Sequence, residues 1–123
     1  MPDVTPTPEA IEAAAQAAHE AARAFRRAVG DPPHPSWDDA PGWQREQAQE
    51  TVRAIAAGAG LVDLHDRWRA AMEADGWTYG EVEDVGAKRH PSLRPLSEIP
   101  LDRRSKPYVY AMAAKAVLHA LGY

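Results

Sequence analysis

The sequence predicts a mainly α-helical protein with about four helices, a long anchored loop between the third and the fourth, and little or no β-sheet. Apolar residues recur at helical spacing in four stretches, and glycine or proline marks the boundaries between them. Residues 76–106 show little helical periodicity and several glycines and prolines. With 123 residues, 45% hydrophobic and 26% charged, the chain has the size and composition of a single folded domain.

The first helix is predicted to begin after Thr7 and to end near Val29. Thr7 is a favourable N-cap, Pro8 suits the first helical position, and Glu9 lies near the positive end of the helix dipole. Gly30 can adopt the left-handed conformation of a helix end, and two prolines follow it. Because the apolar stripe of this helix is mostly alanine, a partner helix can approach closely.

A proline-rich connector over residues 31–40 is expected to return Trp37 to the core. The second helix is predicted over residues 41–57, and the third over residues 61–75, with Gly76 ending it. The best core candidates of the second helix are Trp43, Val52 and Ile55.

Residues 76–106 are predicted to form the long loop, in which short extended pieces are compatible with residues 77–82 but no sheet is expected. The last helix is predicted to start near Lys106 and Pro107 and to end before Gly122. Six apolar residues are expected to anchor the loop: Trp77, Tyr79, Val82, Leu93, Leu96 and Ile99.

Several classes of function are disfavoured by what the sequence lacks. It contains no cysteine, no glycine-rich phosphate loop and no dinucleotide fingerprint, and its five histidines are at least 15 residues apart. No apolar stretch approaches the roughly 20 residues of a membrane helix, and the N-terminus has no export signal. We therefore expect a cytoplasmic protein with no membrane partner, no metal, no cofactor and no catalytic residues.

Two histidines have two interpretations, as acid–base groups or as residues with a structural role. Hydrolysis of a nucleotide at His65 and His90 is the less favoured interpretation, because no nucleophile stands beside an obvious base. His65 lies on the apolar face of its helix and is expected to be buried and hydrogen-bonded to the loop. His19 and His65 are each followed by a glycine eleven residues later, which indicates either two equivalent helices or chance.

Charge is unevenly distributed along the chain. The net charge is −4, so nucleic acid is not an expected partner. Residues 88–106 nevertheless hold six bases and two acids. Guanidinium and ammonium groups suit an anionic ligand, although a solvated basic face is the alternative. The bases are Lys88, Arg89, Arg94, Arg103, Arg104 and Lys106.

Trp77 lies in a glycine-bounded turn beside this basic segment. An aromatic plane close to cations is typical of sites that stack a nucleobase and neutralise its phosphate. The alternative interpretation is that Trp77 fills the base of the loop.

Four motifs in the second half of the chain also resemble a known family. They are His65-Asp66-Arg67-Trp68, Gly76-Trp77-Thr78-Tyr79-Gly80, His90-Pro91-Ser92-Leu93 and Leu96-Ser97-Glu98-Ile99-Pro100. In this order they are similar to the repeat domain of ryanodine receptors, the RyR domain, of the type that occurs singly in bacterial and phage proteins. The resemblance implies a single RyR-like domain over residues 1–123, with an N-terminal helical part (7–60) and a core motif (61–123). The chain departs from the family pattern at Ser92 and at Pro107, which puts a ligand contact at the start of the last helix in doubt.

The resemblance further implies a function, because paired RyR repeats form a clamp in which an adenine nucleotide can bind between aromatic residues. A single-copy protein would rebuild such a pair as a homodimer. The leading hypothesis is a non-enzymatic binding module for a small anionic nucleotide, acting as a sensor or sequestering protein. The alternative is a protein-interaction or structural module without such a ligand. The expected ligand-binding residues are Trp68, Trp77, Tyr79, Arg89, His90, Arg94 and Lys106.

Overall fold

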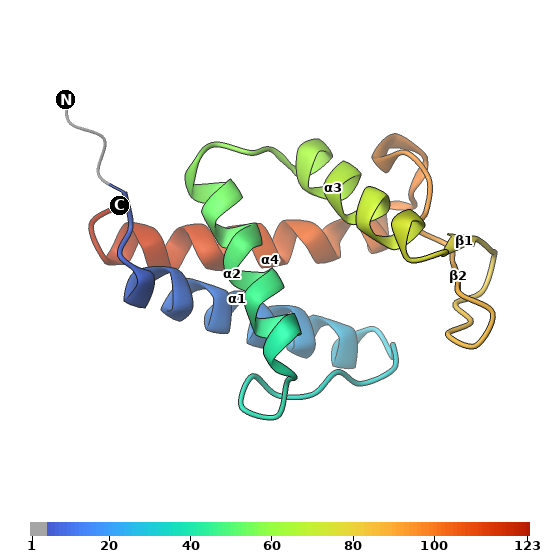
Figure 1. Cartoon of the computed structure of the whole chain (residues 1–123), viewed down its shortest axis with the longest axis horizontal. Helices are drawn as coiled ribbons and strands as arrows, with labels where there is room; N and C mark the ends of the chain where they lie inside the picture. Colours follow the sequence, from blue (N-terminus) through green and yellow to red (C-terminus); the bar gives the residue numbers. More distant parts are fainter. Residues whose placement is uncertain (1–4) are drawn as a thin grey trace. The chain divides into compact units, whose positions relative to one another are not determined.

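The structure is a computed structural model that describes residues 5–123, without the side chain of Asp102 (Figure 1). Its described residues form four α-helices and one small parallel sheet of two strands, so the predicted fold class is confirmed. The elements are α1 (Pro8–Ala28), α2 (Gly42–Ala56), α3 (Leu61–Ala74), β1 (Thr78–Tyr79), β2 (Arg89–His90), the 3-10 turn η1 (Leu96–Glu98) and α4 (Leu101–Ala120).

The chain divides into two compact units. The three-helix unit contains the described residues up to Ala59 together with Lys106–Tyr123, and the loop unit is Gly60–Ser105. The chain passes from the three-helix unit to the loop unit between Ala59 and Gly60, and returns between Ser105 and Lys106, inside α4.

Both predicted ends of α1 are confirmed. The Thr7 hydroxyl accepts a hydrogen bond from the Ala10 N–H at 3.2 Å, and Gly30 has a φ of +78°. The buried face of α1 is formed mainly by alanines, and α1 packs against α2, whose buried residues include Val52 and Ile55. The small side chains allow the close approach that the sequence predicts.

The prediction that Trp43 belongs to the core is wrong, because its side chain is 67% exposed. Trp43 precedes Val52 by nine residues, which is about two and a half helical turns. The two side chains therefore project from opposite sides of α2, and Val52 takes the core side.

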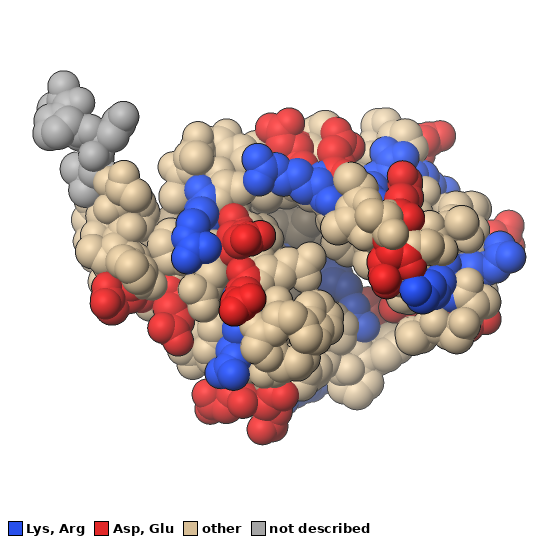
Figure 2. All heavy atoms as spheres, viewed as in Figure 1, with Lys and Arg blue, Asp and Glu red and all other residues tan. Residues whose placement is uncertain are grey.

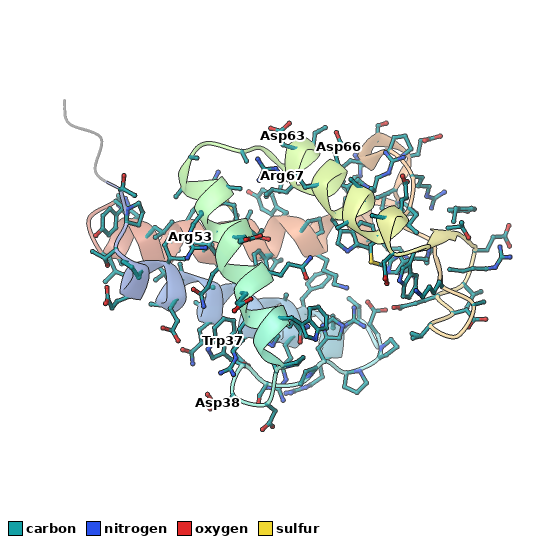
Figure 3. All side chains as sticks on the ribbon, in the orientation of Figure 1. Trp37, Asp38, Arg53, Asp63, Asp66 and Arg67 are labelled. Atoms are coloured by element: carbon teal, nitrogen blue, oxygen red, sulfur yellow. The ribbon has the colours of Figure 1, made fainter. Side chains whose placement is uncertain are left out.

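Trp37 is buried at 4% exposure, as predicted, and lies beside α1 (Figure 3). Its backbone N–H donates to the Glu20 carboxylate at 2.9 Å, and this bond lowers the pKa of Glu20. Three α1 side chains also donate to connector carbonyls: His19 Nε2 to Pro35 O (2.8 Å), Arg23 Nε to His34 O (3.2 Å) and Arg26 Nε to Pro32 O (3.0 Å). The prolines of the connector lack N–H groups, so side chains from α1 hold the segment in place.

The last helix begins at Leu101, six residues before the Pro107 that was expected to start it. The Pro100 carbonyl accepts the N–H groups of Arg103 and Arg104, so the first turn forms directly after Pro100. Pro107 lies inside α4, where its missing N–H removes only one ladder bond.

Two tyrosines, one within α4 and one after it, form hydrogen bonds with other segments of the three-helix unit. The Tyr123 hydroxyl accepts from the Thr7 N–H at 3.4 Å, and the Tyr110 hydroxyl donates to the Ala48 carbonyl at 3.3 Å. Within residues 5–123, no helix has the length and apolar character needed to span a membrane.

Candidate functional site

The site is organised by the end of α3. Gly76 has a φ of +89°, a conformation that favours glycine. The Gly76 N–H donates to the Glu73 carbonyl and the Trp77 N–H to the Met72 carbonyl, both at 3.0 Å. This pair of bonds is a Schellman motif, which reverses the chain and leads Trp77 directly into β1.

The loop that follows is held at both ends. Thr78 pairs with Arg89 in the two-stranded sheet, and the Thr78 N–H donates to the Lys88 carbonyl at 2.9 Å. Asp84 and Arg89 exchange two backbone hydrogen bonds of 2.9 Å. The Lys88 ammonium donates to the carbonyl of Asp75 at 2.7 Å. A cation at this C-terminal end of α3 also interacts favourably with the helix dipole. The loop therefore has a defined conformation.

His90 lies in an aromatic cluster. Its ring centroid is 5.0 Å from that of Trp68 and 6.5 Å from that of Trp77, both in edge-on arrangements. Nδ1 accepts a hydrogen bond from the Ser92 N–H at 3.0 Å, so in the neutral ring the proton is on Nε2. Nε2 lies 3.9 Å from a carboxylate oxygen of Glu83.

Arg94 is positioned through its backbone by α3. His65, which is 7% exposed, donates from Nε2 to the Arg94 carbonyl at 2.7 Å, so the expected structural role of this histidine is confirmed. The guanidinium carbon of Arg94 lies 5.4 Å from the ring centroid of Tyr79. This distance is within the range of a cation–π interaction. Nε of Arg94 is buried and has no hydrogen-bond partner among the described residues.

The loop unit thus brings together five of the predicted site residues, which we call the aromatic–cationic cluster: Trp68, Trp77, Tyr79, His90 and Arg94. Arg89 lies next to the cluster in β2 and is exposed. A Cβ placed on Gly80 would approach the Cβ of Arg89 to 2.8 Å, so only glycine fits beside this arginine. Lys106 belongs to the three-helix unit.

Two of the expected loop anchors are exposed. Tyr79 is 44% exposed and Val82 is 76% exposed, so the prediction that they anchor the loop is wrong. Both lie on a segment whose conformation is set by backbone hydrogen bonds and by Lys88, which removes the need for these side chains to be buried. Leu93 and Ile99 are buried as expected.

Arg69 and Arg104 were not predicted as site residues, yet each has a buried Nε without a hydrogen-bond partner among the described residues. Arg69 is four residues after His65 and therefore on the same side of α3, which is the sequence signal that points to it. At the end of the Arg69 side chain, one terminal nitrogen lies 3.9 Å from a carboxylate oxygen of Asp66 and the other lies 4.0 Å from a carboxylate oxygen of Glu73. Asp63 and Asp66 project outward from α3 in Figure 3.

Charges on the face of the protein drawn in Figure 2 are interspersed, with lysines and arginines next to aspartates and glutamates. The bases of residues 88–106 make separate contacts, as Lys88 binds the end of α3 and Arg94 covers Tyr79. Within the described residues, no three histidine or carboxylate side chains are grouped so that they could hold a metal ion.

The family model of the RyR domain matches residues 45–123. The chain belongs to the RyR domain family. The match begins within α2 and covers the whole loop unit and α4, so the aromatic–cationic cluster is part of the RyR domain. In this RyR domain protein, α1 and the proline-rich connector lie outside the matched residues. No curated protein matches the chain.

Proposed function

We propose that this RyR domain protein is a non-enzymatic binding module for a small anionic nucleotide, such as an adenine nucleotide or a cyclic nucleotide. It would act in the cytoplasm as a sensor or sequestering protein of the single-copy bacterial or phage type. The observation that carries the proposal is the pairing of Arg94 with the half-exposed ring of Tyr79.

Tyr79 is the better stacking platform of the two aromatic residues in the turn. Trp77 is half-buried and packs edge-on to His90, whereas Tyr79 is 44% exposed. Arg94 lies over the Tyr79 ring, and a nucleobase that stacks on the open face would complete a cation–aromatic–base stack. Trp68, Trp77 and His90 then support the platform.

The anionic part of the ligand would be bound by arginines. Nε of Arg94 is buried and has no hydrogen-bond partner among the described residues, and the exposed Arg89 lies in strand β2 of the sheet. An arginine donates up to five hydrogen bonds in a planar fork that matches phosphate. Lys106, the remaining base of the expected set, lies in the three-helix unit, and its part in ligand binding stays a prediction.

Isothermal titration calorimetry with AMP, ATP and cyclic AMP tests the proposal, with inorganic phosphate as a probe of the anion site alone. We expect Tyr79→Ala to weaken nucleotide binding by about tenfold or more, because stacking on an aromatic ring contributes about 1–3 kcal/mol per base. Trp43→Ala is the control, since Trp43 is a 67% exposed aromatic residue of the three-helix unit.

Two results would count against nucleotide binding: no heat with any nucleotide, or equal affinity of the parent and Tyr79→Ala. Chromatography of the nucleotide after incubation tests the non-enzymatic part of the proposal. We expect the nucleotide to be recovered unchanged, and the appearance of a hydrolysis product would instead favour the acid–base role of His65 and His90.

A further inference from the structure

Residues 81–87 present an acidic and apolar surface, which we call the acidic valine loop. Val82 is 76% exposed and Val85 is 71% exposed. Glu81, Glu83 and Asp84 are also exposed, and the segment contains no base, so its formal charge is −3.

The acidic valine loop is ordered by its own hydrogen bonds. The Asp84 carboxylate accepts from the Ala87 N–H at 3.0 Å, and the Val85 carbonyl accepts from the Lys88 N–H at 3.3 Å. Two backbone bonds to Arg89 close the segment. A loop already held in one conformation loses little entropy on binding, so its exposed valines are well suited to docking.

The second exposed apolar surface lies along α4. Within the three-helix unit, Tyr108 is 53% exposed and Met112 is 45% exposed. Their spacing of four residues places them on one side of the helix, and we call this pair the α4 stripe.

The helix that carries this stripe has the opposite charge. Four bases and one acid in α4 give a formal charge of 4 − 1 = +3, with histidine taken as neutral. The bases are Arg103, Arg104, Lys106 and Lys115, and the acid is Asp102.

We propose that the acidic valine loop of one copy of this protein docks on the α4 stripe of a second copy. Each surface has exposed apolar side chains, and the formal charge of −3 on the loop is complementary to the formal charge of +3 on the helix that carries the stripe. Pairing of two α4 stripes would bring bases together, and pairing of two loops would bring acids together. Because each copy carries both surfaces, the contact forms between identical copies of the chain. The contact is independent of nucleotide binding.

Sedimentation velocity at low and high salt tests the contact. We expect concentration-dependent self-association that weakens as salt screens the charges. Val82→Ser with Val85→Ser should weaken it by about tenfold or more, since each buried valine contributes on the order of 1.5 kcal/mol or more. Val62→Ser is the matched control, because Val62 is 59% exposed on α3 and belongs to neither surface.

Charge reversal distinguishes this contact from other modes of association. One variant carries Glu81→Lys and Glu83→Lys, and the other carries Arg103→Glu and Lys115→Glu. We expect each variant alone to self-associate at least tenfold more weakly than the parent. An equimolar mixture should recover association, because the unchanged loop of the second variant attracts the unchanged helix of the first. Circular dichroism of each variant checks that it is folded.

The proposal is overturned if the parent sediments as a monomer at every concentration and salt, or if both reversed variants associate as strongly as the parent. It is likewise overturned if the serine variant and the Val62→Ser control behave alike. A loss of nucleotide binding with self-association intact would count only against the proposed function.

Discussion

Ionisation of Tyr110 should destabilise the protein at alkaline pH. Its hydroxyl donates to the Ala48 carbonyl, and burial raises the pKa of Tyr110 from 10.0 to about 12. A tyrosine whose pKa is raised by folding makes its full contribution to the free energy of unfolding at pH values below its pKa in the unfolded state, which is 10.0. The contribution is lost as the pH rises toward about 12, because the unfolded state releases the proton first.

The size of the effect follows from the two pKa values. The difference between 10.0 and about 12 corresponds to about 3 kcal/mol of unfolding free energy, lost in full only above the higher value. At about pH 11, midway between the two pKa values, the loss is about half of this.

Urea unfolding of the parent and of Tyr110→Phe, followed by tryptophan fluorescence at about pH 8 and pH 11, measures this loss. Phenylalanine keeps the ring but neither ionises nor donates to the Ala48 carbonyl, and its loss of one hydrogen bond should cost about 1 kcal/mol at the lower pH. Other ionisations occur in both proteins, so they cancel in the difference between parent and variant. We expect the parent to lose about 1–2 kcal/mol of unfolding free energy relative to the variant between the two pH values. A difference that does not change with pH would refute the placement of this hydroxyl in a buried site.

Two further predictions concern the loop unit. Gly80→Ala should destabilise the protein by about 1–3 kcal/mol and weaken nucleotide binding, because the new methyl group would meet the Arg89 side chain. Gly86→Ala is the control, since a Cβ at Gly86 would lie 3.5 Å from its nearest neighbour. Equal melting temperatures for the two variants would contradict the close contact at Gly80. Lys88→Gly should be more stable than Lys88→Ala by about 1 kcal/mol in urea unfolding, because both lose the bond to Asp75 but only alanine is strained at a φ of +54°. Equal stability of the two Lys88 variants would mean that the backbone relaxes from this conformation.

The fold could be predicted from the sequence where the signals are local. The cap at Thr7, the left-handed glycine at Gly30 and the end of the third helix at Gly76 depend on residues within one turn of the helix end, and all three predictions are confirmed. The start of α4 was misplaced because two prolines, seven residues apart, carry the same signal. Which one starts the helix depends on the packing of the whole segment, as the position of Trp43 also does.

The candidate site could be predicted only in part. The turn that carries Trp77 and Tyr79 is visible in the sequence, but its partner strand lies about ten residues further on and is selected by tertiary contacts. Lys106 follows Arg94 by twelve residues and belongs to the other compact unit, so its part in the site stays a prediction. The exposure of Tyr79 could not be predicted because the backbone bonds that hold the loop leave no periodic pattern.

The two buried histidines show why a similar pattern occurs twice in one chain. His19 donates to the Pro35 carbonyl at 2.8 Å, and His65 donates to the Arg94 carbonyl, which precedes a proline, at 2.7 Å. In each case a helix ends at a glycine eleven residues after the histidine, and a returning segment that contains prolines must be held against that helix. Prolines provide no N–H groups, so such a segment offers mainly acceptors, and a buried side chain with one donor satisfies them without introducing a permanent charge. This shared physical requirement accounts for both histidines whether or not the two helices have a common origin.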